Sequence, residues 1–294
     1  SIKSRLESTY DGVVIGPHNV VRYWPKVESD FALHELWQPT TGQAPFWLVH
    51  GSDGSLLIYG KTPASRRASA DPDNPLRISA WLLCESMNPH GEHIAYVYKA
   101  DDQSPDSVID YGIQRYLERV CYGNFTASKD LYAWTVDNLA DLDWHFQLLF
   151  DYGERTTSLT EVPAYDGATL QPWPVRADPF STYGQGFEVR TRRLCRQMLM
   201  FHHFPPSQGD QPVLVRRLLL EHSDATPHWP LSQISAAHYQ AFDASGMVEN
   251  TPPVEFEYSA FEINQIPTRL FETDHQPGIE DGRFYQCVDL YGEG

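Results

Sequence analysis

Apolar and polar positions alternate over short distances along most of the chain, and each run ends at a turn. Residues 45–50 (PFWLVH) and 56–61 (LLIYGK) flank the turn sequence GSDGS. Residues 78–86 (ISAWLLCES) and 92–100 (EHIAYVYKA) flank MNPHG in the same way. Two apolar runs joined by a few residues rich in Gly, Asn and Asp are typical of β-hairpins. The pattern therefore predicts two hairpins between residues 45 and 100.

The same pattern continues downstream. Short runs rich in β-branched and aromatic residues predict further strands at residues 115–124, 129–136, 144–155, 213–223, 252–263 and 283–294. Residues 110–119 have the spacing of one short helix, and residues 228–242 fit either a helix or a strand. The sequence thus predicts a mainly β fold, with extended antiparallel sheets of hairpins and few short helices.

Two periodicities overlap in residues 187–204 (FEVRTRRLCRQMLMFHHF). The first residues alternate as in a strand, whereas Leu194, Met198 and Phe201 also fit one face of a helix. No suitable pair of helix caps flanks the run, and Pro205 and Pro206 follow it, which favours a strand. Such a strand would span on the order of 55 Å. Strands of that length belong to extended sheets, barrels or shells.

Residues 156–180 carry four prolines and little periodicity. They are predicted to form a long surface connection, which would also be the place for a seam between subdomains.

Charge narrows the classes of partner. The chain of 294 residues has 22 Lys and Arg against 39 Asp and Glu, which gives a formal net charge of −17. Phosphate backbones and anionic membranes would be repelled over most of such a surface, so nucleic-acid binding is not expected. No apolar run has the length of a membrane span, and SIKSRLESTY contains no signal-peptide core. The start without Met and the end at VDLYGEG suggest a piece of a longer protein.

Basic residues cluster in the run at 187–204, where four arginines fall within seven residues: Arg190, Arg192, Arg193 and Arg196. An anion site is one interpretation, and pairing with the abundant acidic neighbours is the one we favour. His202 and His203 are adjacent, so on a strand they point to opposite faces and cannot share one metal ion. The other histidines lack ligand spacing and are expected to be hydrogen-bonded structural residues.

Signatures of enzymes are missing from the sequence: it has no GxSxG, GxxxxGK[ST], helix-opening GxGxxG, HExxH or CxxC. Asp151 and Glu154 in FDYGER resemble an acid–base pair, but carboxylates at a strand-to-turn junction are more often turn formers. Asp289 and Glu293 lack the ligand density of a calcium loop. The four cysteines are far apart in apolar runs and are predicted to be buried thiols: Cys84, Cys121, Cys195 and Cys287. The sequence therefore predicts no catalytic, cofactor-binding or metal-binding residue, and no cofactor.

Several phrases together resemble a known family. They are LLFDYGER, DPFSTYGQGFEVRTRRLCRQMLMFHHFP, LVRRLLLEH and YQCVDLYGEG, in this order, with FWLVHGSDGSLLIYGKT and WLLCESMNPHGEHIAYVY before them. The chain is similar to the SpvB-like domain of bacterial toxins, which occurs in TcB subunits of insecticidal Tc toxin complexes and at the N-terminus of the Salmonella virulence protein SpvB. The Gly-rich opening segment of that family is absent here.

The resemblance implies a structural role. Residues 253–262 and 284–294 look like the lead into the β-propeller of TcB subunits, and no proline run follows residue 245. On this interpretation residues 1–280 are an SpvB-like β domain and residues 281–294 begin a propeller-like domain. The chain would be a non-catalytic fragment of an Rhs-like shell, secreted from bacteria. A TcC-type subunit would complete the shell around a cytotoxic cargo, and a TcA-type channel would deliver it.

Two alternatives stay open. The chain could be the N-terminal delivery or secretion module of an SpvB-type effector, whose separate catalytic domain ADP-ribosylates actin. A weaker alternative is a hydrolase or a sugar-binding sheet, because exposed Trp and Tyr side chains can stack on sugars.

Overall fold

A computed structural model of the chain describes residues 6–8, 13–15, 17–69, 74, 76–102, 111–129, 144–165, 170–205, 211–223, 231–243, 246 and 248–259. The chain divides into two compact units, Ser1–Glu257 and Tyr258–Gly294. All the described strands belong to the first unit. The predicted strands at 129–136 and 283–294 lie almost wholly or wholly outside the described residues, as do Cys287, Asp289, Glu293 and the predicted boundary at residue 280.

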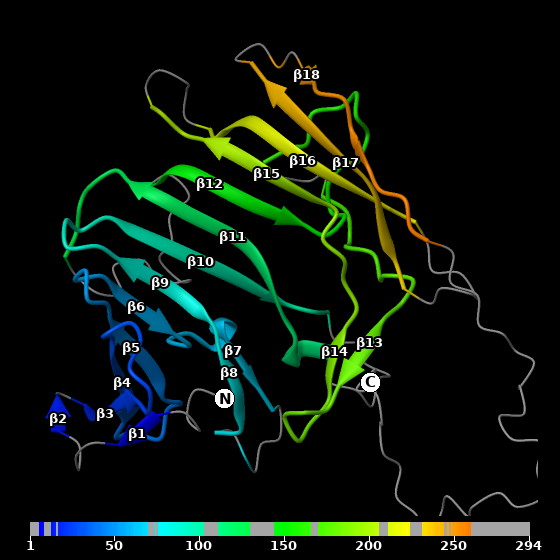
Figure 1. Ribbon diagram of the computed structural model, residues 1–294. Helices are drawn as coiled ribbons and strands as arrows, with labels where there is room; N and C mark the ends of the chain where they lie inside the picture. The colour runs from blue at the N-terminus through cyan, green and yellow to red at the C-terminus, as the bar shows by residue number, and fades with distance from the viewer. Residues whose placement is uncertain are drawn as a thin grey trace, which may run out of the picture. The chain divides into compact units, whose positions relative to one another are not determined.

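Fifteen of the described strands form one antiparallel sheet (Figure 1). Its main path runs β1-β3-β4-β5-β6-β9-β10-β11-β12-β15-β16-β17-β18, with β2 paired to β3 and β19 paired to β17. The bounds of these strands are Leu6–Ser8 (β1), Val13–Ile15 (β2), His18–Pro25 (β3), Leu33–Pro39 (β4), Phe46–His50 (β5), Leu56–Tyr59 (β6), Leu83–Met87 (β9), His93–Ala100 (β10), Arg115–Asn124 (β11), Trp144–Asp151 (β12), Gln197–His202 (β15), Val213–Ser223 (β16), Gln233–Phe242 (β17), Val248–Asn250 (β18) and Val254–Glu255 (β19). The mainly β, antiparallel prediction is confirmed.

Two small sheets accompany the large one. β7 (Arg66–Ala68) pairs with β8 (Ile78–Trp81), and β13 (Phe180–Thr182) pairs with β14 (Val189–Thr191). The described helices are two single 3₁₀ turns, Pro63–Ser65 and Tyr111–Ile113. Along the sheet, most neighbouring strands follow one another in sequence, and the main exceptions are the pairs β6–β9 and β12–β15, between which the strands of the small sheets occur.

The hairpin predicted at residues 45–61 is present, but the one predicted at residues 78–100 has a shorter first arm, because residues 78–81 form β8 in another sheet. β5 pairs with β6 around Gly51–Ser55, and β9 pairs with β10 around Asn88–Glu92. Residues 228–242, which fitted either a helix or a strand, contain strand β17. The expected helix at 110–119 is wrong, because only Tyr111–Ile113 is helical and β11 starts at Arg115.

The predicted single strand over residues 187–204 is also wrong. It is two strands in different sheets, β14 and β15, separated by residues 192–196. The backbone of Arg192 leaves the ladder here: its N–H donates to the Tyr116 hydroxyl at 2.9 Å, and its carbonyl accepts the Arg176 N–H at 2.8 Å. The segment crosses from the small sheet to the large one, so no 55 Å strand forms.

Within the described ranges, the buried apolar side chains form four separate clusters along the sheet. The largest buries Leu149, Leu199, Phe201, Leu214 and Phe242, which come from β12, β15, β16 and β17. Alternation explains the choice, since Leu199 and Phe201 point to the covered face of β15 and the residues between them do not. Part of this face is covered by the described residues of the connection after β12, 152–165 and 170–179, which we call the strap.

Candidate functional site

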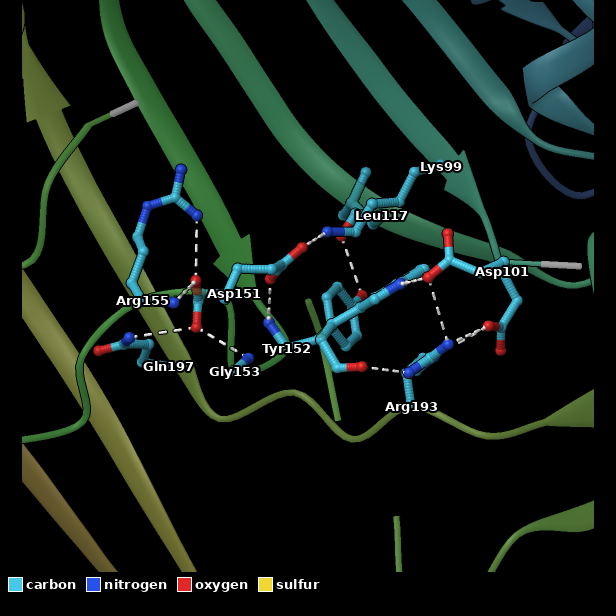
Figure 2. Close-up of polar contacts among 12 residues, drawn as sticks. Lys99, Asp101, Leu117, Asp151, Tyr152, Gly153, Arg155, Arg193 and Gln197 are labelled. Atoms are coloured by element: carbon cyan, nitrogen blue, oxygen red, sulfur yellow. Dashed lines mark hydrogen bonds and ion pairs between the residues drawn. The ribbon is translucent and has the colours of Figure 1, made fainter. Parts of the chain in front are cut away.

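Polar side chains gather where β10 and β12 end (Figure 2). Both strands pair antiparallel with β11, so they run parallel to each other, and their C-terminal ends, Ala100 and Asp151, lie on the same side of the sheet. The strap starts at this side, and residues 192–196 pass across the strand ends. Two carboxylates, Asp101 and Asp151, are the centres of the cluster.

The Asp151 carboxylate is fully buried and organises the start of the strap. Its Oδ1 accepts the Gly153 N–H at 2.9 Å and the Gln197 Nε2–H at 3.2 Å. Its Oδ2 accepts two donors of Arg155, the backbone N–H at 3.1 Å and Nη1 at 3.0 Å. Four donors occupy both oxygens, so the carboxylate closes a turn and presents no free oxygen to a ligand.

The Glu154 side chain stabilises the same turn and links it to β10. Its Oε2 accepts the Tyr152 N–H at 2.9 Å, and its Oε1 pairs with the Lys99 ammonium. That ammonium lies 4.3 Å from the centre of the Trp173 ring. The interpretation of Asp151 and Glu154 as turn formers is confirmed.

Asp101 forms a buried ion pair with Arg193, whose Nε and Nη2 lie 2.9 and 2.5 Å from Oδ1. Both residues are 5% exposed. Arg193 also donates to the Trp173 carbonyl and stacks 4.5 Å above that ring, while Arg192 lies 3.6 Å from the same carboxylate. The Arg193 side chain points inward to Asp101, which lies 92 residues earlier in the sequence, and so it interrupts the alternation of a strand. The acidic pairing predicted for the arginines is confirmed for Arg192 and Arg193.

Three aromatic rings fill the space beside this ion pair. Tyr116, Tyr152 and Trp173 meet edge to face, with ring centres 5.2 to 5.7 Å apart. Burial raises the pKa of both tyrosines, and the Tyr152 hydroxyl donates to the Leu117 carbonyl at 2.9 Å. Trp173 comes from the strap, so the strap is fastened to the sheet by a packed ring as well as by charge.

A second set of contacts fastens the middle of the strap. The Arg217 side chain from β16 is fully buried and donates to Gln197 Oε1 at 2.6 Å and Gln240 Oε1 at 2.9 Å. It also donates to the strap carbonyls of Ser158 at 2.8 Å and Thr156 at 3.0 Å. Burial lowers the pKa of Arg217 to about 10, so the guanidinium stays charged at neutral pH.

The adjacent histidines belong to different aromatic contacts. His202 is half buried and meets the edge of Phe146, with ring centres 5.0 Å apart. His203 is 2% exposed and lies 5.6 Å from Phe125. Neither ring nitrogen of His203 has a hydrogen-bond partner within the described part of the chain. Its fixed position comes from its backbone N–H, which donates to the His145 carbonyl at 2.9 Å.

His93 is a hydrogen-bonded structural histidine, as predicted. It is fully buried, with Nδ1 2.6 Å from Glu85 Oε1 and Nε2 2.7 Å from the Ser128 carbonyl. Burial alone would lower the pKa of His93, but the bonds to Glu85 and Ser128 outweigh it and raise that pKa. Both neighbouring oxygens are acceptors, so the doubly protonated ring satisfies both contacts.

The arrangement holds the fold together and leaves little for chemistry. Each carboxylate of the cluster is occupied by internal donors, and no group of three or more His, Cys, Asp or Glu among the described residues could hold a metal ion. Cys121 is a buried thiol, as predicted, whereas the thiols Cys84 and Cys195 are only partly buried. Burial raises the pKa of Cys195 to about 11. None of the helices in the described ranges is long and apolar enough to cross a membrane.

Sequence reasoning missed most of the fastening residues: Lys99, Asp101, Trp173, Arg217 and Gln240. No local pattern marks Arg217 in VLVRRLLLEHS, because strict alternation from the buried Leu214 would bury Arg216, and a shift in the register of β15 against β16 buries Arg217 instead.

Comparison of the sequence and the structure with known proteins shows the family of the chain. A family model described as "SpvB: Salmonella virulence plasmid 65kDa B protein" matches residues 2–204. The chain belongs to the SpvB family. It is 43% identical over 235 residues to the mono(ADP-ribosyl)transferase SpvB of Salmonella typhimurium (strain 14028s / SGSC 2262), a match that covers 78% of this chain and 38% of that relative. The resemblance read from the sequence is confirmed, and the chain spans well under half of the length of this relative.

Solved structures of two kinds are similar. The N-terminal domain of the effector protein SpvB from Salmonella typhimurium strain LT2 has a TM-score of 0.70 and 40% identity, covering 81% of this chain and 74% of that one. The TcdB2-TccC3-Cdc42 crystal structure has a TM-score of 0.75 and 36% identity, covering 88% of this chain and 12% of that one. The crystal structure of TcdB2-TccC3 without its hypervariable C-terminal region has a TM-score of 0.74 and 37% identity.

Proposed function

We propose that this chain is a non-catalytic wall segment of a secreted toxin-delivery protein. In this proposal it belongs to a TcB-type subunit, which together with a TcC-type subunit encloses a cytotoxic cargo that a TcA-type channel delivers. The observation that carries the proposal is the similarity to TcdB2-TccC3 over 88% of the chain at a TM-score of 0.75. The fastened strap and the continuous sheet are features that suit a rigid wall.

The polar cluster supports the non-catalytic part of the proposal. A general base or nucleophile needs an atom that can reach a substrate, and catalytic groups sit in accessible clefts. Asp151 is fully buried with both oxygens occupied, and Asp101 and Arg193 are each 5% exposed. These groups stabilise the fold and leave no reactive atom at the surface.

A second candidate parent is an effector of the SpvB type, in which this chain would be the N-terminal delivery or secretion module. The observation that favours it is the higher identity to the Salmonella transferase, 43% against 36–37% for the TcdB2-TccC3 structures. In that case the ADP-ribosylation of actin would belong to a separate domain. For either parent we propose that residues 1–280 are the SpvB-like domain and that residues 281–294 begin the next one.

Co-expression tests the wall proposal. The full-length gene product is expressed with a TcC-type protein, purified through a tag on one of them, and treated with protease. A wall protein co-purifies and protects the C-terminal part of its partner from digestion. A full-length product that stays alone and modifies actin in the presence of NAD would favour the effector parent and contradict the wall.

A further inference from the structure

An unassigned pocket lies at the other end of the sheet from the polar cluster, on one face of β4, β5 and β6 with β8 alongside. Its volume is about 630 Å³, within the range of sites for small ligands and side chains. Apolar and aromatic residues make most of its walls: Ala32, His34, Trp47, Val49, Leu57, Tyr59, Ala80 and Trp81. Register explains the gathering, because Trp47 pairs with Tyr59 and Val49 pairs with both His34 and Leu57.

The two indoles of the pocket are held in place before anything binds. Trp47 and Trp81 are nearly perpendicular, at 87° with ring centres 6.4 Å apart. The Trp81 indole N–H donates to the Pro45 carbonyl at 2.8 Å, and the Tyr23 ring meets Trp47 at 5.3 Å. Binding to such walls requires little ordering of side chains, which favours affinity.

The rim of the pocket is acidic. Asp30 and Asp53 are both exposed lining residues, and no lysine or arginine is among the described residues that line it. The Asp53 carboxylate accepts the Ser55 N–H at 2.9 Å, and the hydrogen bonds from Ser55 lower the pKa of Asp53, so it is ionised at neutral pH. Aromatic rings in the walls and exposed carboxylates at the rim together form an environment that attracts a cation.

A strained aromatic residue stands beside the rim. Phe31 has a φ of 54°, an unusual value for a bulky residue, and its side chain is 76% exposed. Its N–H donates to Glu28 at 2.7 Å, which helps to hold this conformation. Exposed aromatic residues next to a preformed pocket are typical of protein-binding surfaces.

We propose that this pocket binds an arginine side chain of a partner polypeptide, with an apolar neighbour of that arginine against Phe31. Arginine suits the site better than lysine, because its flat guanidinium stacks on an indole and pairs with a carboxylate at the same time. Charge complementarity selects the occupant, since the rim is acidic and the chain carries a net charge of −17. The assignment goes beyond the proposed function and holds for either candidate parent.

Binding of two matched peptides to the 294-residue chain tests the proposal. Fluorescein-labelled Gly-Leu-Arg-Phe-Gly is compared with the same peptide carrying citrulline, which has the shape of arginine without its charge. We expect the arginine peptide to bind about 10-fold more tightly, the combined effect of a cation–π contact with an indole and an ion pair with a rim carboxylate. Equal affinities for the two peptides would overturn the proposal.

Charge variants show whether the rim is responsible. Asp30→Asn with Asp53→Asn should weaken the arginine peptide about 3- to 5-fold, because the indole contact remains, and should leave the citrulline peptide unchanged. Glu249→Gln with Glu257→Gln makes the same change in net charge at exposed positions far along the sequence and should leave both peptides unchanged. An equal loss in both double variants would mean attraction by net charge alone, which contradicts a site. Binding of arginine methyl ester as tight as that of the peptide would identify a small cation as the occupant and overturn the polypeptide.

Discussion

Replacing Arg217 with Met should destabilise the fold more than almost any other single change in a charged residue. Its guanidinium donates four hydrogen bonds, of 2.6, 2.8, 2.9 and 3.0 Å, to Gln197, Ser158, Gln240 and Thr156. Methionine fills a similar volume but leaves these buried acceptors with fewer donors, at about 1–3 kcal/mol for each one left unsatisfied. Some acceptors will relax, so we expect a loss of about 3–5 kcal/mol in the free energy of unfolding.

The neighbouring arginine provides a matched control. Arg216 is exposed, and Arg216→Met should change the free energy of unfolding by less than about 0.5 kcal/mol. Urea unfolding at neutral pH, followed by tryptophan fluorescence, measures both variants under one condition. Limited trypsin digestion should also cut the strap faster in R217M than in R216M, because two of the lost bonds hold strap carbonyls. A loss below about 1 kcal/mol for R217M, or equal losses for both variants, would refute the argument that buried donors fasten the strap.

Three further predictions concern the ion pair, the buried histidine and one turn. Asp101→Asn removes the charged partner of the buried Arg193 and should lower the free energy of unfolding by about 3–5 kcal/mol in urea. Asp102→Asn is the control, because the Asp102 side chain is 74% exposed, and it should lower the same quantity by less than about 1 kcal/mol. Similar losses in the two variants would contradict a buried ion pair. The folded pKa of His93 lies above the ordinary 6.5, so its stabilisation is complete below that pH and is lost as the pH rises through the folded value. The urea midpoint of His93→Gln should therefore depend less on pH than that of the parent chain in this window, whereas parallel curves would contradict the assignment. Gly42→Ala and Gly60→Ala both place a side chain at positive φ, at about 1 kcal/mol from the backbone alone, but only at Gly60 would the new Cβ lie 2.9 Å from the Cβ of Trp81. Gly60→Ala should thus melt clearly lower in a thermal scan, and equal melting temperatures would show that Trp81 moves freely.

The alternation of the sequence was sufficient to predict the fold class and the β5–β6 and β9–β10 hairpins. Those strands depend on contacts between residues that are close in sequence, and their Gly- and Asn-containing turns are recognisable. The break at residues 192–196 was not predictable from alternation. It depends on Arg193 reaching Asp101 across 92 positions, and no local pattern records such a partner.

The polar cluster shows the same limit. Asp151 and Glu154 were recognisable as turn formers, because their partners Tyr152, Gly153 and Arg155 are adjacent in sequence. Arg217 was not, since Arg216 and Arg217 are identical in type and only the pairing of β16 with β15 and β17 decides which one is buried. Nor could the strap be told from an ordinary surface connection, because its contacts are made largely by its backbone carbonyls and by Trp173.

Cryo-electron microscopy of the full-length gene product expressed together with a TcC-type protein tests the central claim most directly. We predict that residues 1–257 form part of a closed wall around a cavity, with the sheet order from β1 to β18 retained and the cargo inside. A separate domain that hangs from a flexible linker beside a transferase domain, with no enclosed space, would contradict the account.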